Sequence, residues 1–112
     1  MADDLMLKDL DNFTGTEKYH TIMNSYITSG VKYIMENGYS WVVTDALVIL
    51  KMKLKKEPFV AVHLDIKDEK AVLQYEDGNG NVLFKQKYNW TNCKQSLVLY
   101  FTDNVLMLSG EY

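Results

Sequence analysis

One long apolar run in the middle of the chain, residues 39–56 (YSWVVTDALVILKMKLKK), constrains the fold more than any other segment. It is about twice as long as a usual strand, and it ends in lysines without a turn signal. Wound at about 100° per residue, it places apolar side chains over one broad side, with a narrow polar stripe of Thr44, Lys51 and Lys55 opposite. The run therefore predicts a mostly buried core helix over residues 40–55, which Pro58 stops.

Two residues of this helix, Trp41 and Asp45, lie one turn apart beside the polar stripe. An aspartate in that position could be a catalytic or ligand-binding carboxylate, or it could hydrogen-bond a neighbouring backbone group or a tyrosine hydroxyl. The first alternative makes Asp45 and Trp41 candidates for a pocket between the central helix and a sheet, with His63 and a tyrosine as further polar groups.

The residues before the central helix predict two shorter helices, over 3–12 and 29–37. Acidic residues suit the N-terminus of the first helix. Thr28 or Ser29 can cap the second helix, and the pair Asn37 and Gly38 is typical of a helix end. The conformation of residues 14–28 stays open, although 19–27 could form an extended segment at a sheet edge.

From Phe59 onward the apolar residues recur with a period of two, which is typical of strands. This alternation predicts strands over about 59–66, 71–76, 81–88, 96–102 and 104–108. The turn residues DGNG at 77–80 favour a hairpin between the second and third of them. We therefore expect a single α+β domain over residues 1–112, with N-terminal helices packed on one face of a four- to five-stranded antiparallel sheet.

The composition argues against several classes of protein. The net charge is −3 and every basic residue is lysine, whereas arginine is the usual reader of guanine edges and phosphates, so nucleic-acid binding is disfavoured. No apolar run reaches the ~20 residues of a membrane span, and the start MADDLML is unlike a signal peptide. Cys93 is the single cysteine, so no internal disulfide can form and we expect a cytoplasmic protein.

No spacing of residues points to a catalytic or metal site, so we expect no enzyme activity, no metal and no cofactor. His20, His63 and Cys93 are too scattered for structural zinc. Cys93 stands in a polar loop, which predicts an ordinary surface or half-buried thiol. Residues 77–81 (DGNGN) match the start of a calcium loop, but the glycine and glutamate that such a loop needs further on are missing.

Charged and aromatic residues mix on the expected solvent side of the sheet. The candidates for partner binding are His63, Asp65, Gln74, Lys85, Lys87 and Tyr100, with Trp90 nearby in a loop. Aromatic residues are enriched in protein interfaces, so this face could bind another protein. The alternative is an ordinary amphipathic sheet exposed to water, with cross-strand pairs of opposite charge.

Several segments along the whole chain together resemble a family of small uncharacterised proteins of bacteria, plasmids and phages, classed as a domain of unknown function. The matching pieces are 13–17 (FTGTE), 28–33 (TSGVKY), 38–41 (GYSW), the helix containing Asp45, the strand from Phe59, 76–80 (EDGNG) and 106–112 (LMLSGEY). The ending departs from the family, which often has a proline-serine pair where this chain has Ser109 and Gly110. The resemblance implies one compact domain and a mobile-element setting, and it implies no activity.

We therefore expect a small non-enzymatic protein-binding module, such as a phage- or plasmid-encoded accessory protein or an inhibitor of a host defence protein. The alternative is a small-molecule-binding protein or small enzyme that uses the Asp45 and Trp41 pocket. An exposed strand edge at 105–108 or at 19–27 would also allow a homodimer.

Overall fold

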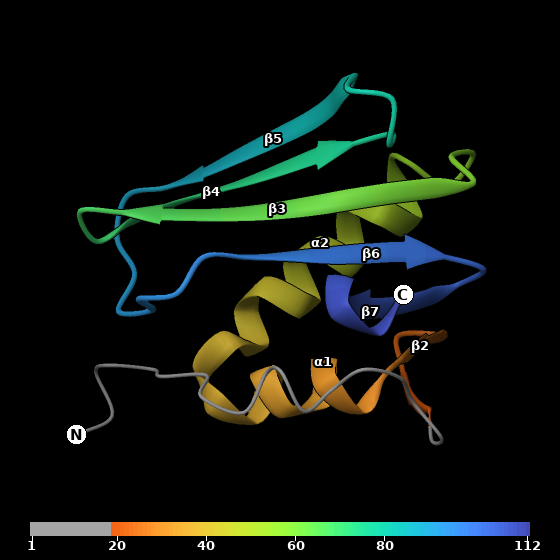
Figure 1. Ribbon diagram of the computed structural model, residues 1–112, viewed down its shortest axis with the longest axis horizontal. Helices are drawn as coiled ribbons and strands as arrows, with labels where there is room; N and C mark the ends of the chain where they lie inside the picture. The colour runs from red at the N-terminus through yellow and green to blue at the C-terminus, as the bar shows by residue number, and fades with distance from the viewer. Residues whose placement is uncertain (1–18) are drawn as a thin grey trace.

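The computed structural model describes residues 19–112, which form one seven-stranded sheet with helices against it (Figure 1). The strands are β1 His20–Ile22, β2 Ser25–Ile27, β3 Phe59–Lys67, β4 Lys70–Glu76, β5 Val82–Tyr88, β6 Leu97–Thr102 and β7 Val105–Leu108. The helices are α1 Ser29–Ile34 and α2 Ser40–Met52, joined by a π-helical segment Met35–Tyr39, and a 3-10 turn Ser109–Glu111 ends the chain.

The strand order in the sheet is β1-β2-β7-β6-β3-β4-β5. Strands β3, β4 and β5 form a meander, and β6 returns along a longer connection to lie beside β3, which is a Greek key. The pairing of β2 with β7 is parallel, so the sheet is mixed. This parallel pair joins the beginning of the described chain to its end.

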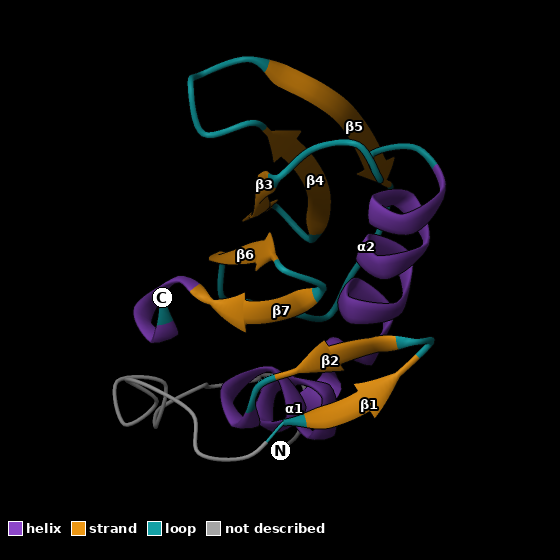
Figure 2. Ribbon diagram, turned by 90° about the vertical axis from the view of Figure 1, so that its right-hand side faces the viewer, coloured by secondary structure: helices purple, strands orange, loops and turns teal. Residues whose placement is uncertain are grey.

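The helical part bends at Gly38, whose φ of 97° few residues other than glycine adopt. Thr28 caps α1, because its Oγ1 accepts a hydrogen bond from the Val31 amide. The bend redirects the chain into α2, which lies along one side of β3 to β7 (Figure 2).

The core lies between α2 and the sheet. Val42, Val43, Ala46, Leu47 and Leu50 of α2 are at most 1% exposed. The inner side of the sheet supplies the matching residues Val60, Val62, Leu64, Ala71, Leu73, Tyr75, Leu99, Leu106 and Leu108. Strand alternation places the polar residues of the same strands on the opposite side, which we call the outer face.

A single carboxylate fastens the two ends of the described chain. Glu111 accepts hydrogen bonds from the Thr28 hydroxyl at 2.6 Å, the Gly30 amide at 3.1 Å and the Leu108 amide at 3.0 Å. A Cβ at Gly30 would stand 2.6 Å from both Glu111 Oε1 and Leu108 Cδ1, so this close approach requires glycine.

The predicted fold is wrong in the number of strands and in the type of sheet. The five predicted strands are present with bounds shifted by at most one residue. The error lies in the β1–β2 hairpin and in its parallel pairing to β7. Strands β1 and β2 have only three residues each, too few for a period of two to show, and β7, the second partner of β2, is about eighty positions away.

The helices also differ from the expectation, and only the broad α+β description holds loosely. The second predicted helix, 29–37, is the short α1 followed by the π-helical segment, and α2 ends at Met52 instead of residue 55. The predicted helix over 3–12 lies outside the described residues.

The edges of the sheet are β1 and β5, whereas β7 lies between β6 and β2. The edge that we expected at 105–108 is therefore occupied, and of the two segments considered for pairing in a homodimer only 19–27 contains an edge strand. Among the helices of residues 19–112, none is long and apolar enough to cross a membrane.

Candidate binding surfaces

The outer face is ordered in rows because directly paired residues of neighbouring strands point to the same side. One row runs Lys85, Gln74, His63 and Val98 across β5, β4, β3 and β6. The row on one side of it contains Lys87, Val72 and Asp65, and the row on the other side contains Glu76, Ala61, Tyr100 and Met107. The structure thus brings together all the predicted partner-binding residues except Trp90.

Three aromatic rings gather on this face. Phe59, Tyr100 and Tyr112 form a mutual cluster, with ring centroids 5.1 to 5.7 Å apart in tilted and edge-on arrangements. We call this the outer aromatic cluster. Tyr112 is 72% exposed, so the cluster reaches into solvent. The sequence signalled Tyr100, but not Phe59 and Tyr112, because the C-terminal turn that folds Tyr112 back has no periodic pattern.

A hydrogen-bonded polar group adjoins the cluster. Glu76 Oε2 lies 3.3 Å from His63 Nε2 and accepts a hydrogen bond from Gln74 at 3.0 Å. The side chains of His63 and Glu76 are 35% and 23% exposed, so they are held by each other and remain accessible. Lys85, Lys87 and Asp65 are also exposed on this face.

The pocket candidates lie elsewhere, at the start of α2. Trp41 and Asp45 line a pocket of about 280 Å³ together with Tyr88, Trp90, Thr91 and Asn92, which we call the Trp41 pocket. Tyr88 donates a hydrogen bond of 2.6 Å from its hydroxyl to Asp45 Oδ2, and its ring meets Trp41 edge-on at 4.8 Å. Burial, followed by this bond, raises the pKa of Tyr88, so its hydroxyl stays a donor at neutral pH.

The Trp41 pocket lies between α2 and Tyr88 of the edge strand β5, so it contains Trp41, Asp45 and a tyrosine of the pocket expected between the central helix and the sheet. His63 is not part of it, because it points to the outer face, and apolar side chains fill the space between α2 and the middle of the sheet. Asp45 is the boundary residue bonded to a tyrosine hydroxyl that the sequence allowed, and it also faces a hollow. Trp90 belongs to this hollow and not to the outer face.

The loop that carries Trp90 is anchored on both sides. The Thr91 amide donates to the Glu69 carbonyl at 2.8 Å, and Thr91 Oγ1 accepts from the Cys93 amide at 3.0 Å. Cys93 is fully buried, with Sγ 3.5 Å from the Gly38 carbonyl, so the expectation of a surface or half-buried thiol is wrong. The reason is that this loop crosses the end of the core to connect β5 with β6.

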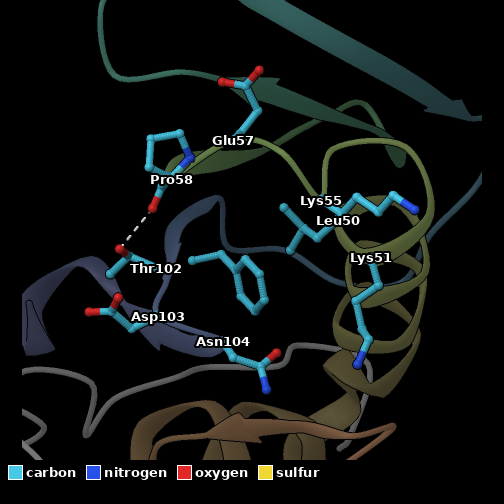
Figure 3. Close-up of a pocket in the computed structure, with 9 residues that line it drawn as sticks. Leu50, Lys51, Lys55, Glu57, Pro58, Thr102, Asp103 and Asn104 are labelled. Atoms are coloured by element: carbon cyan, nitrogen blue, oxygen red, sulfur yellow. Dashed lines mark hydrogen bonds between the residues drawn. The ribbon is translucent and has the colours of Figure 1, made fainter.

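A second, larger hollow of about 380 Å³ lies at the other end of α2 (Figure 3). Its floor includes Leu50, and charged side chains stand around it. The charged groups of Lys55, Glu57 and Asp103 point outward in different directions. Lys51 is already bonded to the Met23 carbonyl and to Ser25. Because no polar groups converge, this hollow defines no ligand chemistry.

Hydrogen bonds within the hairpin loop account for the calcium-like residues 77–81. Asp77 Oδ1 accepts from the amides of Asn79 and Asn81, and Oδ2 accepts from the Asn81 side chain at 2.8 Å. These bonds, with that to the Asn81 side chain first, lower the pKa of Asp77. In the part of the chain that the structure describes, no histidine, cysteine and carboxylate side chains cluster as metal ligands would.

Comparison with known proteins agrees with the family resemblance but adds no activity. No curated protein and no solved structure gives a significant match to the chain. One family model matches residues 4–112, which is nearly the whole sequence. The chain therefore belongs to a family of unknown function, DUF6876.

Proposed function

We propose that this protein is a non-enzymatic binding module whose partner is another protein that docks on the outer face. The observation that carries the proposal is the outer aromatic cluster, which projects from a sheet side that neither α1 nor α2 covers. A protein interface typically has an apolar and aromatic centre and a polar rim. The cluster of Phe59, Tyr100 and Tyr112 matches the centre.

The neighbouring rows supply a rim. His63 and Gln74 converge on Glu76, so these side chains are already oriented before a partner arrives, which lowers the entropy lost on binding. Lys85 and Lys87 present two positive charges on β5, and Asp65 presents a negative charge on β3, in the same row as Lys87 with Val72 of β4 between them. Charges of both signs at a rim favour a partner with a complementary pattern.

The proposal extends to the setting of the protein. The motif resemblance supports a mobile-element setting only, and within that setting we propose a phage- or plasmid-encoded accessory protein that inhibits a host defence protein. The cytoplasm is the compartment that the single, buried Cys93 supports, since no disulfide is part of the described fold.

The test is quantitative capture of partners from a bacterial lysate, read by mass spectrometry with and without nuclease. Tyr100→Ala and Tyr112→Ala should each lower capture of a specific protein by about tenfold or more, as truncation of an aromatic hot spot does. Because Tyr112 is largely exposed, Tyr112→Ala should leave the fold intact.

The matched control is Met52→Ala, which changes a side chain that is 75% exposed on α2, on the other side of the sheet. Capture should be unchanged by this substitution. Equal capture by the Tyr100, Tyr112 and Met52 variants would contradict the outer face as the docking surface. Loss of capture after nuclease treatment would show that the partner is a nucleic acid and not a protein.

A small-molecule binding function is the second candidate, and the Trp41 pocket is the observation that favours it. Its lining contains one carboxylate and three aromatic rings, with no nucleophile or general base positioned against another reactive group. We therefore propose binding there in preference to catalysis.

A further inference from the structure

Asp45 is an acidic group without a basic partner. No ion pair joins it to a lysine or histidine of residues 19–112. Its Oδ2 accepts from Tyr88, and its Oδ1 accepts no hydrogen bond from the described residues. None of the other residues that line the Trp41 pocket is basic. Within residues 19–112, no basic side chain therefore pairs with the negative charge that faces the pocket.

The walls beside this charge are aromatic. Trp41, Tyr88 and Trp90 supply two indole rings and a phenol ring around a hollow of about 280 Å³. Cations are attracted to the faces of aromatic rings, most strongly to tryptophan, when they lie within about 6 Å of the ring centre. Trp90 is 66% exposed and makes no ring contact within residues 19–112, so its surface is free for a ligand.

The frame around the pocket is fixed before any ligand arrives. Trp41 and Asp45 stand one turn apart on α2, and the hydrogen bond of Tyr88 holds the carboxylate in place. Thr91 is buried and bonded to Glu69, which holds the wall that follows Trp90. A preformed site of this kind loses little entropy when it binds.

We propose that the Trp41 pocket is a binding site for an organic cation, whose ammonium or guanidinium head group packs against Trp41 and Trp90 and pairs with Asp45. The volume lies just below the range of about 300 to 1,000 Å³ usual for whole drug-sized ligands, so it suits a single head group. A free quaternary ammonium compound and the basic side chain of a protein share this chemistry. The inference does not depend on the outer face, which lies on the other side of the sheet.

Tryptophan fluorescence offers a direct test, because the two tryptophans of the chain both line this pocket. The full chain is titrated with tetramethylammonium chloride and with N-acetyl-arginine amide at constant ionic strength. The neutral controls are tert-butanol and N-acetyl-citrulline amide. The indole N–H signals in NMR spectra report the same binding.

The expected result is a saturable change with a dissociation constant on the order of 1 mM for the cations, and a weaker or absent change for the neutral compounds. Tighter binding of tetramethylammonium assigns the site to a free ligand, and tighter binding of the capped arginine assigns it to a protein side chain. No saturable change for either cation, or equal changes with the neutral compounds, would overturn the proposal.

Two variants test separately how the charge of Asp45 and the ring of Trp90 contribute to cation binding. Asp45→Asn keeps an acceptor for Tyr88 but removes the charge, and it should weaken cation binding at least tenfold. Trp90→Leu changes an exposed side chain and should weaken it several-fold with Trp41 still reporting. Asp103→Asn, at an exposed carboxylate in the turn between β6 and β7 near the other end of α2, is the matched control and should bind like the unchanged protein. Unaltered binding by Asp45→Asn in a folded protein would overturn the proposal.

Discussion

The two sides of the sheet differ in how far other parts of the protein cover them. The inner side is closed by α2, and residues such as Leu47 and Leu73 have no exposed surface. On the outer side Tyr112 is largely exposed to solvent, and polar side chains such as Gln74 and Glu76 hydrogen-bond to each other. Under the proposed function, stability depends on the inner side and recognition on the outer side, so substitutions should separate the two.

The largest loss of stability should come from the inner side. Leu47→Ala removes a fully buried side chain from the middle of α2, so we expect the free energy of unfolding to fall by about 2 to 5 kcal/mol. Urea denaturation measures this change. Val48→Ala, next to it but 39% exposed, is the control and should cost much less. Equal effects of the two substitutions would mean that α2 does not cover the core as described.

The next largest loss of stability should come from the hydrogen bonds by which Glu111 joins the two ends of the described chain. Glu111→Ala leaves the Thr28 hydroxyl and the amides of Gly30 and Leu108 without their acceptor, at an expected cost of about 1 to 3 kcal/mol. Thermal unfolding of Glu111→Ala and of the exposed control Glu36→Ala compares the two carboxylates. A loss no larger than that of the control would contradict the role of Glu111 in joining the ends.

High pH should lower the free energy of unfolding through Tyr39, which is buried in the core. Burial raises the pKa of Tyr39 from about 10 to about 12, although its hydroxyl is bonded to the Gln95 backbone. Between these pH values the unfolded chain loses this proton and the folded chain keeps it. The free energy of unfolding should therefore fall as pH rises, by about 1.4 kcal/mol per pH unit for this group.

Denaturation at several pH values from 9 to 12 measures that slope, with Tyr39→Phe as the comparison. The variant lacks the ionisable hydroxyl, so its stability should decline less steeply. Parallel slopes for the two proteins would show that Tyr39 does not carry the effect.

The smallest effect on stability should come from the outer face. Lys85 and Lys87 are exposed, so Lys85→Glu with Lys87→Glu should change the free energy of unfolding by about 0.5 kcal/mol or less. The same double variant should reduce capture of the partner protein, since it reverses two charges at the rim. Lys55→Glu with Lys56→Glu, at the end of α2, reverses equal charge elsewhere. If both double variants captured the partner equally well, the rim would have no part in recognition.

The sequence predicted those parts of the fold that have strong local patterns. The strands from Phe59 onward alternate clearly, and α2 has a long apolar run, so both were placed with small errors at their ends. The sequence allowed an extended segment at a sheet edge over residues 19–27 but did not predict the β1–β2 hairpin, because each strand has three residues and the turn uses Met23 and Asn24 at positive φ, with no glycine to mark it.

The binding surfaces were only partly predictable for the same reason. Alternation identified His63, Gln74 and Lys85 as neighbours on one face, since strand pairing converts a period of two into rows. The approach of Trp90 and Tyr88 to Trp41 depends on how the chain passes from β5 to β6 across the end of the core. Such long-range packing has no signature in a local pattern.

The most direct test of the assignment of recognition to the outer face is lysine footprinting of the free and partner-bound protein. Amine acetylation is followed residue by residue by mass spectrometry. Binding at the outer face predicts that Lys85 and Lys87 lose reactivity when the partner is bound, while Lys55, exposed near the end of α2, keeps it. Protection of Lys55 with unchanged reactivity of Lys85 and Lys87 would contradict the account.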